Sequence, residues 1–442
     1  MADMKRDVIY VVLASALPAF GNFVAVALAL RYLDAEWLGK SYALIAFFFV
    51  AIDLFNFGSP RIFTVDKVRS QASTLIFLDC LSALGSTMVF ATVGTLLINY
   101  GLFARTQFGM VMVLAPMFYG LSHFSLGVLR FYGRSGTICA ISTVSALSRV
   151  LIIVLLIERR SLDAYLPDLL LLVEAVYGAM LLMAYLHSLR RGPPRDSEFF
   201  LPEAEKFNFR MFDYKAFFMQ NRKEILGSWY GNAIFSGAKH VDIMIVAFIV
   251  GPAAGSLYRG VKSVHNLAFN CGQGVALVLS GRLKRVTVAL LRLPQGRVMA
   301  AGVVVLFALV SLASWLACRI HLFPIAALGS HAVQFGFMFV AFFGAALIFV
   351  CRVLSLLVFS ANRASFVAIS TLEVGASLLF VSVLSHGFGV IGALTGIVCA
   401  GLLVLAASLT ISRSAARHTL ASIQTTDAPV VGKWHGTCKN EA

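Results

Sequence analysis

Polar and cationic side chains recur at helical spacing inside an otherwise apolar stretch of the chain. Arg259, Lys262, Asn266, Asn270 and Gln273 step by three and four residues, which places them on one face of a helix. Two cations one turn apart repel each other, so the pattern is best explained by an anion that binds between them. The alternative is that both cations, in the outer third of the helix, snorkel to a membrane interface.

Two more cations lie within apolar stretches. Arg149 follows Ser142 and Ser145 on one helical face and has no acid on its own helix, which favours a position facing the inside of the bundle. Lys239 lies three residues before Asp242, and the two could simply form an ion pair. Arg149 is a candidate ligand of the anion. Lys239 is kept as a second candidate, with the ion pair to Asp242 as its alternative.

Carboxylates also occur inside apolar stretches. A carboxylate in a membrane can take up a proton and so couple transport to an ion gradient. It can equally be the counter-ion of an Arg on a neighbouring helix. Both interpretations stay open for the acids, which are Asp53, Asp79, Glu174, Asp242 and Glu373.

Signatures of catalysis are missing from the sequence. It contains no G-x-x-x-x-G-K-[ST] loop for ATP, no G-x-S-x-G motif, and no acidic pair in a connecting segment that would hold Mg²⁺. The seven cysteines are scattered without a C-x-x-C pair, so neither a disulfide framework nor a metal site is predicted. We expect a protein that is not an enzyme and needs no cofactor.

The composition excludes a water-soluble enzyme. Of 442 residues, 59% are hydrophobic and only 13% are charged, against about 25% charged in soluble proteins. A helix needs roughly 20 apolar residues to cross a membrane. We predict an all-α integral membrane protein with twelve transmembrane helices. The predicted ranges are 8–30, 39–60, 74–98, 107–129, 137–157, 165–187, 226–250, 255–280, 298–318, 333–360, 365–384 and 388–411, with a tight turn at 385–387 between the last two.

Lys and Arg residues set the predicted orientation. With the N-terminus inside, the inner connections hold 25 of the 36 Lys and Arg residues and the outer connections hold six. Positive residues concentrate on the cytoplasmic side, so both termini are predicted to be cytoplasmic. The same asymmetry accounts for the net charge of +15 without a nucleic-acid partner.

The predicted helices fall into two halves. Residues 1–187 and 226–412 form two six-helix lobes, joined by a cytoplasmic linker at 188–225 and followed by a cytoplasmic tail at 413–442. The linker is basic and aromatic, which fits an amphipathic helix on the inner leaflet or a plain connection.

A weak internal repeat relates the two lobes. A shift of 216 residues pairs Gly39 with Gly255 and Tyr42 with Tyr258, and it aligns two further pairs of glycines. Transporters built from such parallel repeats place their substrate site between the halves, near the middle of the membrane.

Two stretches of the sequence carry a family resemblance. Residues 242–258, with an Asp, an apolar run, Gly251, Gly255 and Tyr258, resemble the seventh-to-eighth-helix signature of the polysaccharide transporters, the Wzx-type flippases of the MOP superfamily. The first two predicted helices are similar too, with Gly21-Asn22, Leu38-Gly39 and the segment 53–58.

The resemblance implies a function and a location. Members of this family have twelve helices in two lobes and flip an undecaprenyl-diphosphate-linked oligosaccharide, an O-antigen or exopolysaccharide precursor, across a bacterial inner membrane. A cationic lumen then holds the headgroup, and Arg61 could meet it at the cytoplasmic entrance. Partners would be membrane lipid and the polymerase and chain-length regulator of the same pathway. The alternatives are a MATE-like cation antiporter, disfavoured by the cationic intramembrane residues, and an O-antigen polymerase or ligase, disfavoured by the short outer connections.

Overall fold

Helices make up all the regular structure of the computed structural model where it describes the chain. The described residues are 2–57, 72–131, 134–191, 214–236, 240–280, 297–324, 330–361 and 363–426. The helices are α1 (Ala2–Tyr32), α2 (Ala35–Phe55), α5 (Ala72–Asn99), α6 (Val111–Phe131), α7 (Ser135–Glu158), the short 3₁₀ helix η1 (Arg160–Tyr165), α8 (Leu166–Arg191), α9 (Tyr214–Ser236), α10 (Asp242–Ile249), α11 (Pro252–Ser280), α13 (Arg297–Arg319), α14 (His331–Ala361) and α15 (Arg363–Thr426). The prediction of an all-α protein is confirmed for these residues.

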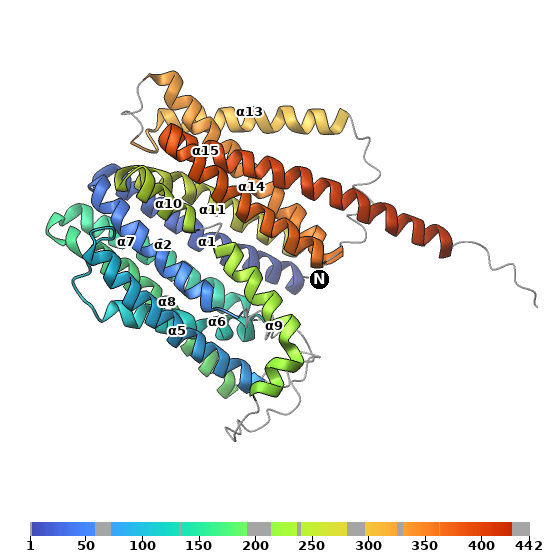
Figure 1. Ribbon diagram of the computed structural model, residues 1–442, viewed down its shortest axis with the longest axis horizontal. Helices are drawn as coiled ribbons and strands as arrows, with labels where there is room; N and C mark the ends of the chain where they lie inside the picture. The colour runs from blue at the N-terminus through green and yellow to red at the C-terminus, as the bar shows by residue number, and fades with distance from the viewer. Residues whose placement is uncertain are drawn as a thin grey trace, which may run out of the picture.

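The helices form two bundles that meet along three helices. In the N-terminal lobe, α1 packs on α7, α2 on α5, α5 on α6, and α6 on α8. In the C-terminal lobe, α14 lies between α11, α13 and α15. The lobes meet where α1 and α2 pack on α11, and Figure 1 shows these helices between α5–α8 on one side and α13–α15 on the other.

The chain is a multi-pass membrane protein. Seven of the described helices are long and apolar enough to cross a membrane, and one of them, at Val367–Ile411, is 45 residues long. Each of the twelve predicted ranges overlaps a helix. The number of crossings and the side on which the termini lie stay predictions.

Several predicted boundaries differ from the structure. The range 226–250 was expected to be one helix; α9 covers it up to Ser236 and α10 from Asp242, and residues 237–239 between them lie outside the described residues. The helix α2 ends at Phe55 rather than at residue 60, because Asn56 takes up an extended conformation. The helix α9 begins at Tyr214, within the predicted linker, and α15 continues into the predicted tail.

The turn between the last two predicted helices is displaced along the chain. It was expected at 385–387, but the backbone breaks at Gly389, with φ 60° and ψ −140°. Only glycine adopts these dihedral angles at little cost. The chain folds back tightly here: a Cβ built on Gly392 would lie 1.9 Å from the carbonyl oxygen of Leu384. The two arms of α15 therefore pack closely beside the break.

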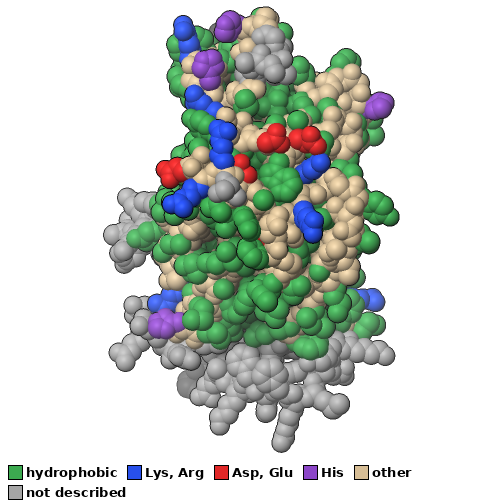
Figure 2. All heavy atoms as spheres, turned by 90° about the vertical axis from the view of Figure 1, so that its left-hand side faces the viewer, with side chains coloured by type: hydrophobic (Ala, Val, Ile, Leu, Met, Phe, Trp, Pro, Cys, Tyr) green, Lys and Arg blue, Asp and Glu red, His purple; other side chains and the backbone are tan. Residues whose placement is uncertain are grey.

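The lobes are packed together at the end of the bundle that carries the predicted periplasmic connections, called here the outer end. Figure 2 looks onto this side and shows charged side chains gathered among apolar ones. The largest apolar cluster spans both lobes, with Leu30 and Leu38 from one and Val246 and Tyr258 from the other. Gly39 lies against the backbone of α11, where a Cβ would be 1.8 Å from the Pro252 carbonyl oxygen.

This close contact predicts that Gly39→Ala destabilises the protein. The added methyl cannot fit against backbone atoms, and overpacking of this kind costs about 1–3 kcal/mol. Gly336→Ala on α14 is the matched control, because nothing lies within 4 Å of a Cβ at Gly336. We expect a lower thermal midpoint in detergent for the first variant and an unchanged or higher midpoint for the second. Equal midpoints would show that the lobes do not pack this closely.

Candidate functional site

Arg259 occupies the surface where the two lobes meet. It lies on α11, and its side chain is buried, with 6% of the residue exposed. Its Nη2 donates a long hydrogen bond of 3.4 Å to Oδ1 of Asn22 on α1. Its guanidinium carbon lies 5.7 Å from the ring centroid of Tyr42 on α2. One cationic side chain of the C-terminal lobe thus contacts two helices of the N-terminal lobe.

The guanidinium of Arg259 forms no ion pair with an acid of the described residues. Two nearby acids, Asp242 and Glu174, act on it only from a distance, because each is paired with another cation, Asp242 with Lys262 and Glu174 with Arg149. Within the same part of the chain, Nε and Nη1 of Arg259 have no hydrogen-bond partner. A buried cation without a counter-ion is strongly unfavourable, and each unpaired buried donor adds to the cost. This position is therefore suited to an anion that supplies both the charge and the acceptors.

Lys262 lies one turn further along α11 and is already paired. Its Nζ forms a buried ion pair with Asp242 of α10, whose Oδ2 also accepts a 2.7 Å hydrogen bond from Tyr258. Asp242 therefore pairs with Lys262; Lys239, the partner that its sequence spacing suggested, lies outside the described residues. Lys262, like Arg259, is only 6% exposed. Neither side chain reaches the surface of the protein, so the snorkelling alternative is wrong for both.

Arg149 also has a counter-ion, on a helix that the sequence did not link to it. Its Nη2 lies 2.6 Å from Oε1 of Glu174 on α8, and its Nε donates to the same oxygen at 3.2 Å. Its Nη1 lies 3.4 Å from the carbonyl oxygen of Pro18. The structure thus supports the counter-ion interpretation for Glu174. The ion pair joins α7 to α8, so Arg149 is not left free to bind a ligand.

The other predicted site residues are more dispersed. Asn266 and Asn270 are half-buried on α11, and Asn270 donates to the carbonyl oxygen of Asn266 on its own helix. Asp53 is half-buried near the end of α2. Glu373 lies on α15, apart from Arg259, beside a small cavity. Two candidates, Arg61 and Lys239, lie outside the described residues.

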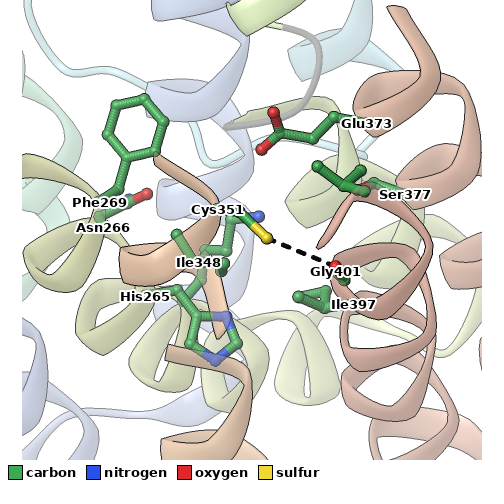
Figure 3. A pocket seen from close by; sticks show the side chains of 11 residues that line it. His265, Asn266, Phe269, Ile348, Cys351, Glu373, Ser377, Ile397 and Gly401 are labelled. Carbon is green, nitrogen blue, oxygen red and sulfur yellow. Dashed lines mark hydrogen bonds between the residues drawn. The ribbon is translucent and has the colours of Figure 1, made fainter. Parts of the chain in front are cut away.

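That cavity lies inside the C-terminal lobe, between α11, α14 and the two arms of α15. Its volume is about 40 Å³, and Figure 3 shows the side chains that surround it. Polar groups from three helices line it, namely Lys262, His265, Asn266, Cys351, Glu373 and Ser377. The space is too small for a sugar or a diphosphate.

Sequence reasoning missed four side chains of these sites. Asn22 and Tyr42, which contact Arg259, lie on other helices, so no spacing rule could link them to it. His265 follows Lys262 by three residues, a spacing that places both on neighbouring parts of one face. Arg352 on α14 is 5% exposed, with its guanidinium carbon 4.2 Å from the ring centroid of Phe269. Its place within a predicted helix was the only signal for it.

Comparisons with known proteins identify the fold. No protein-family model and no curated protein sequence matches the chain. Among solved structures, an inward-facing multidrug resistance MATE family transporter of the MOP superfamily aligns with a TM-score of 0.58 at 11% identity, over 95% of this chain and 100% of the other. The chain has the fold of the MATE transporters. A MATE in the bent conformation aligns at 0.57 and 13% identity, over 96% and 97% of the two chains. The lipid II flippase MurJ, in an inward closed conformation, aligns at 0.58 and 14% identity, over 95% and 93%.

The buried pair between α7 and α8 generates a prediction about this MATE- and MurJ-like fold. Glu174→Gln leaves the Arg149 cation uncompensated, which costs about 3–5 kcal/mol at a buried pair. The double variant Arg149→Gln/Glu174→Gln removes both charges and should recover most of that loss. Thermal unfolding of the purified variants in detergent measures both. If the double variant is as unstable as the sum of the single ones, the two side chains are not coupled.

Proposed function

We propose that this protein flips an undecaprenyl-diphosphate-linked oligosaccharide from the cytoplasmic to the periplasmic leaflet of a bacterial inner membrane. The observation that carries the proposal is the buried guanidinium of Arg259 at the junction of the lobes, which has two unpaired donors and forms no ion pair with an acid of the described residues. The substrate class follows from the chemistry of that site and from the resemblance to the polysaccharide transporters.

A diphosphate matches this site chemically. It is a compact anion with several acceptor oxygens, and an Arg side chain binds such groups through charge-assisted hydrogen bonds. In a low-dielectric surrounding these interactions are stronger than in water. The polyprenyl chain can stay in the lipid while the headgroup crosses between the lobes, so the protein needs to shelter only the polar part of the substrate.

The arrangement of the lobes supports alternating access. Apolar side chains of both lobes form one cluster at the outer end, and Arg259 contacts α1 and α2 at the same junction. In our proposal the headgroup enters from the cytoplasmic side and binds Arg259. Separation of the outer end then releases it to the periplasm. Any polymerase and chain-length regulator would act on the released unit.

A MATE-like cation antiporter is the second candidate, because MATE structures and MurJ align with this chain equally well. Such a protein needs acidic side chains that are available to a cation. Near the lobe junction, Asp242 is occupied by Lys262 and Glu174 by Arg149, whereas Arg259 forms no ion pair with an acid of the described residues. The charges therefore favour an anionic substrate. An O-antigen polymerase or ligase, an enzyme, remains the weaker alternative, because the aligned structures described above are transporters and a flippase.

The function is tested in a strain that lacks the gene. Its lipid-linked oligosaccharides are extracted, and the leaflet that holds them is determined. We expect single repeat units confined to the cytoplasmic leaflet. Units that reach the periplasm without being polymerised would contradict the proposal and indicate an enzyme that acts later. An unchanged glycolipid pool would contradict it too, and would direct attention to drug sensitivity.

Arg259→Gln tests the headgroup site within this function. The variant keeps a donor for Asn22 but removes the charge, and we expect it to insert normally and to lose most of the surface glycan. Arg319→Gln is the matched control: Arg319 also lies over an aromatic ring, that of Trp315, but it is exposed at the end of α13. Normal surface glycan in the Arg259 variant, at equal protein level, would eliminate Arg259 as the headgroup ligand.

A further inference from the structure

One side chain of the connection between α13 and α14 is buried where the two lobes meet. Phe323 lies beyond the end of α13 at Arg319, yet only 2% of the residue is exposed. It belongs to the apolar cluster that spans both lobes. Connections run over the surface of a protein as a rule, so a buried aromatic side chain in one of them requires an explanation.

The backbone just before Phe323 has a defined turn. Among the described residues, His321 is the only non-glycine with a positive φ, which is 49°. The amide of His321 donates to the carbonyl oxygen of Cys318 at 3.2 Å, and the amide of Leu322 donates to that of Ala317 at 3.0 Å. These hydrogen bonds form a Schellman motif, in which one left-handed residue, usually glycine, ends a helix. A specific turn therefore ends α13, and Phe323 follows it almost directly.

The ring of Phe323 contacts one helix of each lobe. On α1 of the N-terminal lobe it makes an edge-to-face contact with Phe23, with 6.5 Å between the ring centroids and 87° between the ring planes. On α11 of the C-terminal lobe it lies over Gly260, where a Cβ would be 3.1 Å from Cε1 of the ring. Leu30 of α1 lies against the same glycine. The ring thus occupies space that the missing side chain of Gly260 leaves between the two helices.

This contact adjoins the candidate anion site. Gly260 follows Arg259 on α11, and Phe23 follows Asn22 on α1. Arg259 donates to Asn22 across the same pair of helices, at a long 3.4 Å. Hydrogen bonds weaken with distance, whereas a buried edge-to-face ring pair adds to the burial of apolar area. We therefore expect the ring of Phe323 to hold α1 against α11 more firmly than the polar contact does.

We propose that Phe323 is a wedge that keeps the contact between α1 and α11, called here the seam, closed. The two lobes separate along the seam only when the ring leaves the space beside Gly260. Because Phe323 belongs to a connection and not to a long helix, it leaves that space by a change at the turn formed by His321. The wedge thereby controls whether the residues beside Arg259 are reached by water.

Closure of the seam can be measured without a substrate. Val26 lies one turn after Asn22 on α1 and is 1% exposed, so Val26→Cys places a reporter thiol in the seam. The full-length variant is purified and held in lipid nanodiscs, and a water-soluble maleimide is added. A buried thiol reacts only when the structure around it opens. Mass spectrometry of the peptide that contains residue 26 gives the rate, so the seven native cysteines can stay in place.

Truncation of the ring tests the wedge. In the Val26→Cys protein, we expect Phe323→Ala to raise the labelling rate about tenfold or more, because opening no longer breaks the contacts of a buried ring. Phe90→Ala is the matched control: Phe90 is 0% exposed and packs on Phe47 and Phe48 inside the N-terminal lobe. Its rate should stay within about twofold, since distant sites act independently. Phe323→Leu should give an intermediate rate and serves if the alanine variant does not fold.

A second variant approaches the wedge from the opposite side. Gly260→Ala places a methyl group 3.1 Å from the ring of Phe323, which is closer than side chains normally pack, so the ring has to move. We expect this variant also to raise the labelling rate of residue 26.

Two results would overturn the proposal. An unchanged rate in folded Phe323→Ala would show that the ring does not hold the seam. An equal rise in Phe90→Ala would show that the loss of any buried ring loosens the protein. Neither result depends on what the protein transports, so failure of the flippase proposal leaves this test intact, and failure of the wedge leaves Arg259 as the proposed headgroup ligand.

Discussion

The need to neutralise cations away from water determines how this molecule is organised. Lys262 is matched by Asp242 and Arg149 by Glu174, and each pair joins two helices inside one lobe. Arg259, at the boundary between the lobes, has a weak contact with Asn22 and the ring of Tyr42 instead of an acid. This is the physical basis for the anion site that we propose.

The weak internal repeat gains meaning from the same contacts. Tyr42 and Tyr258, which a shift of 216 residues superposes in the sequence, are both buried. Tyr258 donates to Asp242 within its own lobe, whereas Tyr42 lies beside Arg259 of the opposite lobe. Gly39 and Gly255 differ in a similar way: one approaches Pro252 across the boundary, and the other approaches Ala247 within its lobe. The paired positions therefore make different contacts in the two lobes. Those of the C-terminal lobe pack within their own lobe, and those of the N-terminal lobe contact the opposite lobe.

The proposed anion site and the small polar cavity of the C-terminal lobe both lie along helix α11. Arg259 faces the lobe junction, and His265, less than two turns away, faces α14. Lys262 lies between them and contributes to both the ion pair with Asp242 and the wall of the cavity. Charges this close on one helix, surrounded by apolar side chains, influence each other strongly because little water screens them.

The sequence by itself determined the membrane environment, the helical fold and the stripe of cations on α11, because apolar length and helical spacing are local properties. It did not determine which cations are neutralised. Arg149 and Glu174 are 25 residues apart and Lys262 and Asp242 are 20 apart, so their pairing depends on how separate helices pack. The bend at Gly389 lies away from the predicted turn for a similar reason, since hydropathy changes little across it. Only the tertiary structure distinguished the neutralised cations from Arg259 and showed that His265 lines a small cavity.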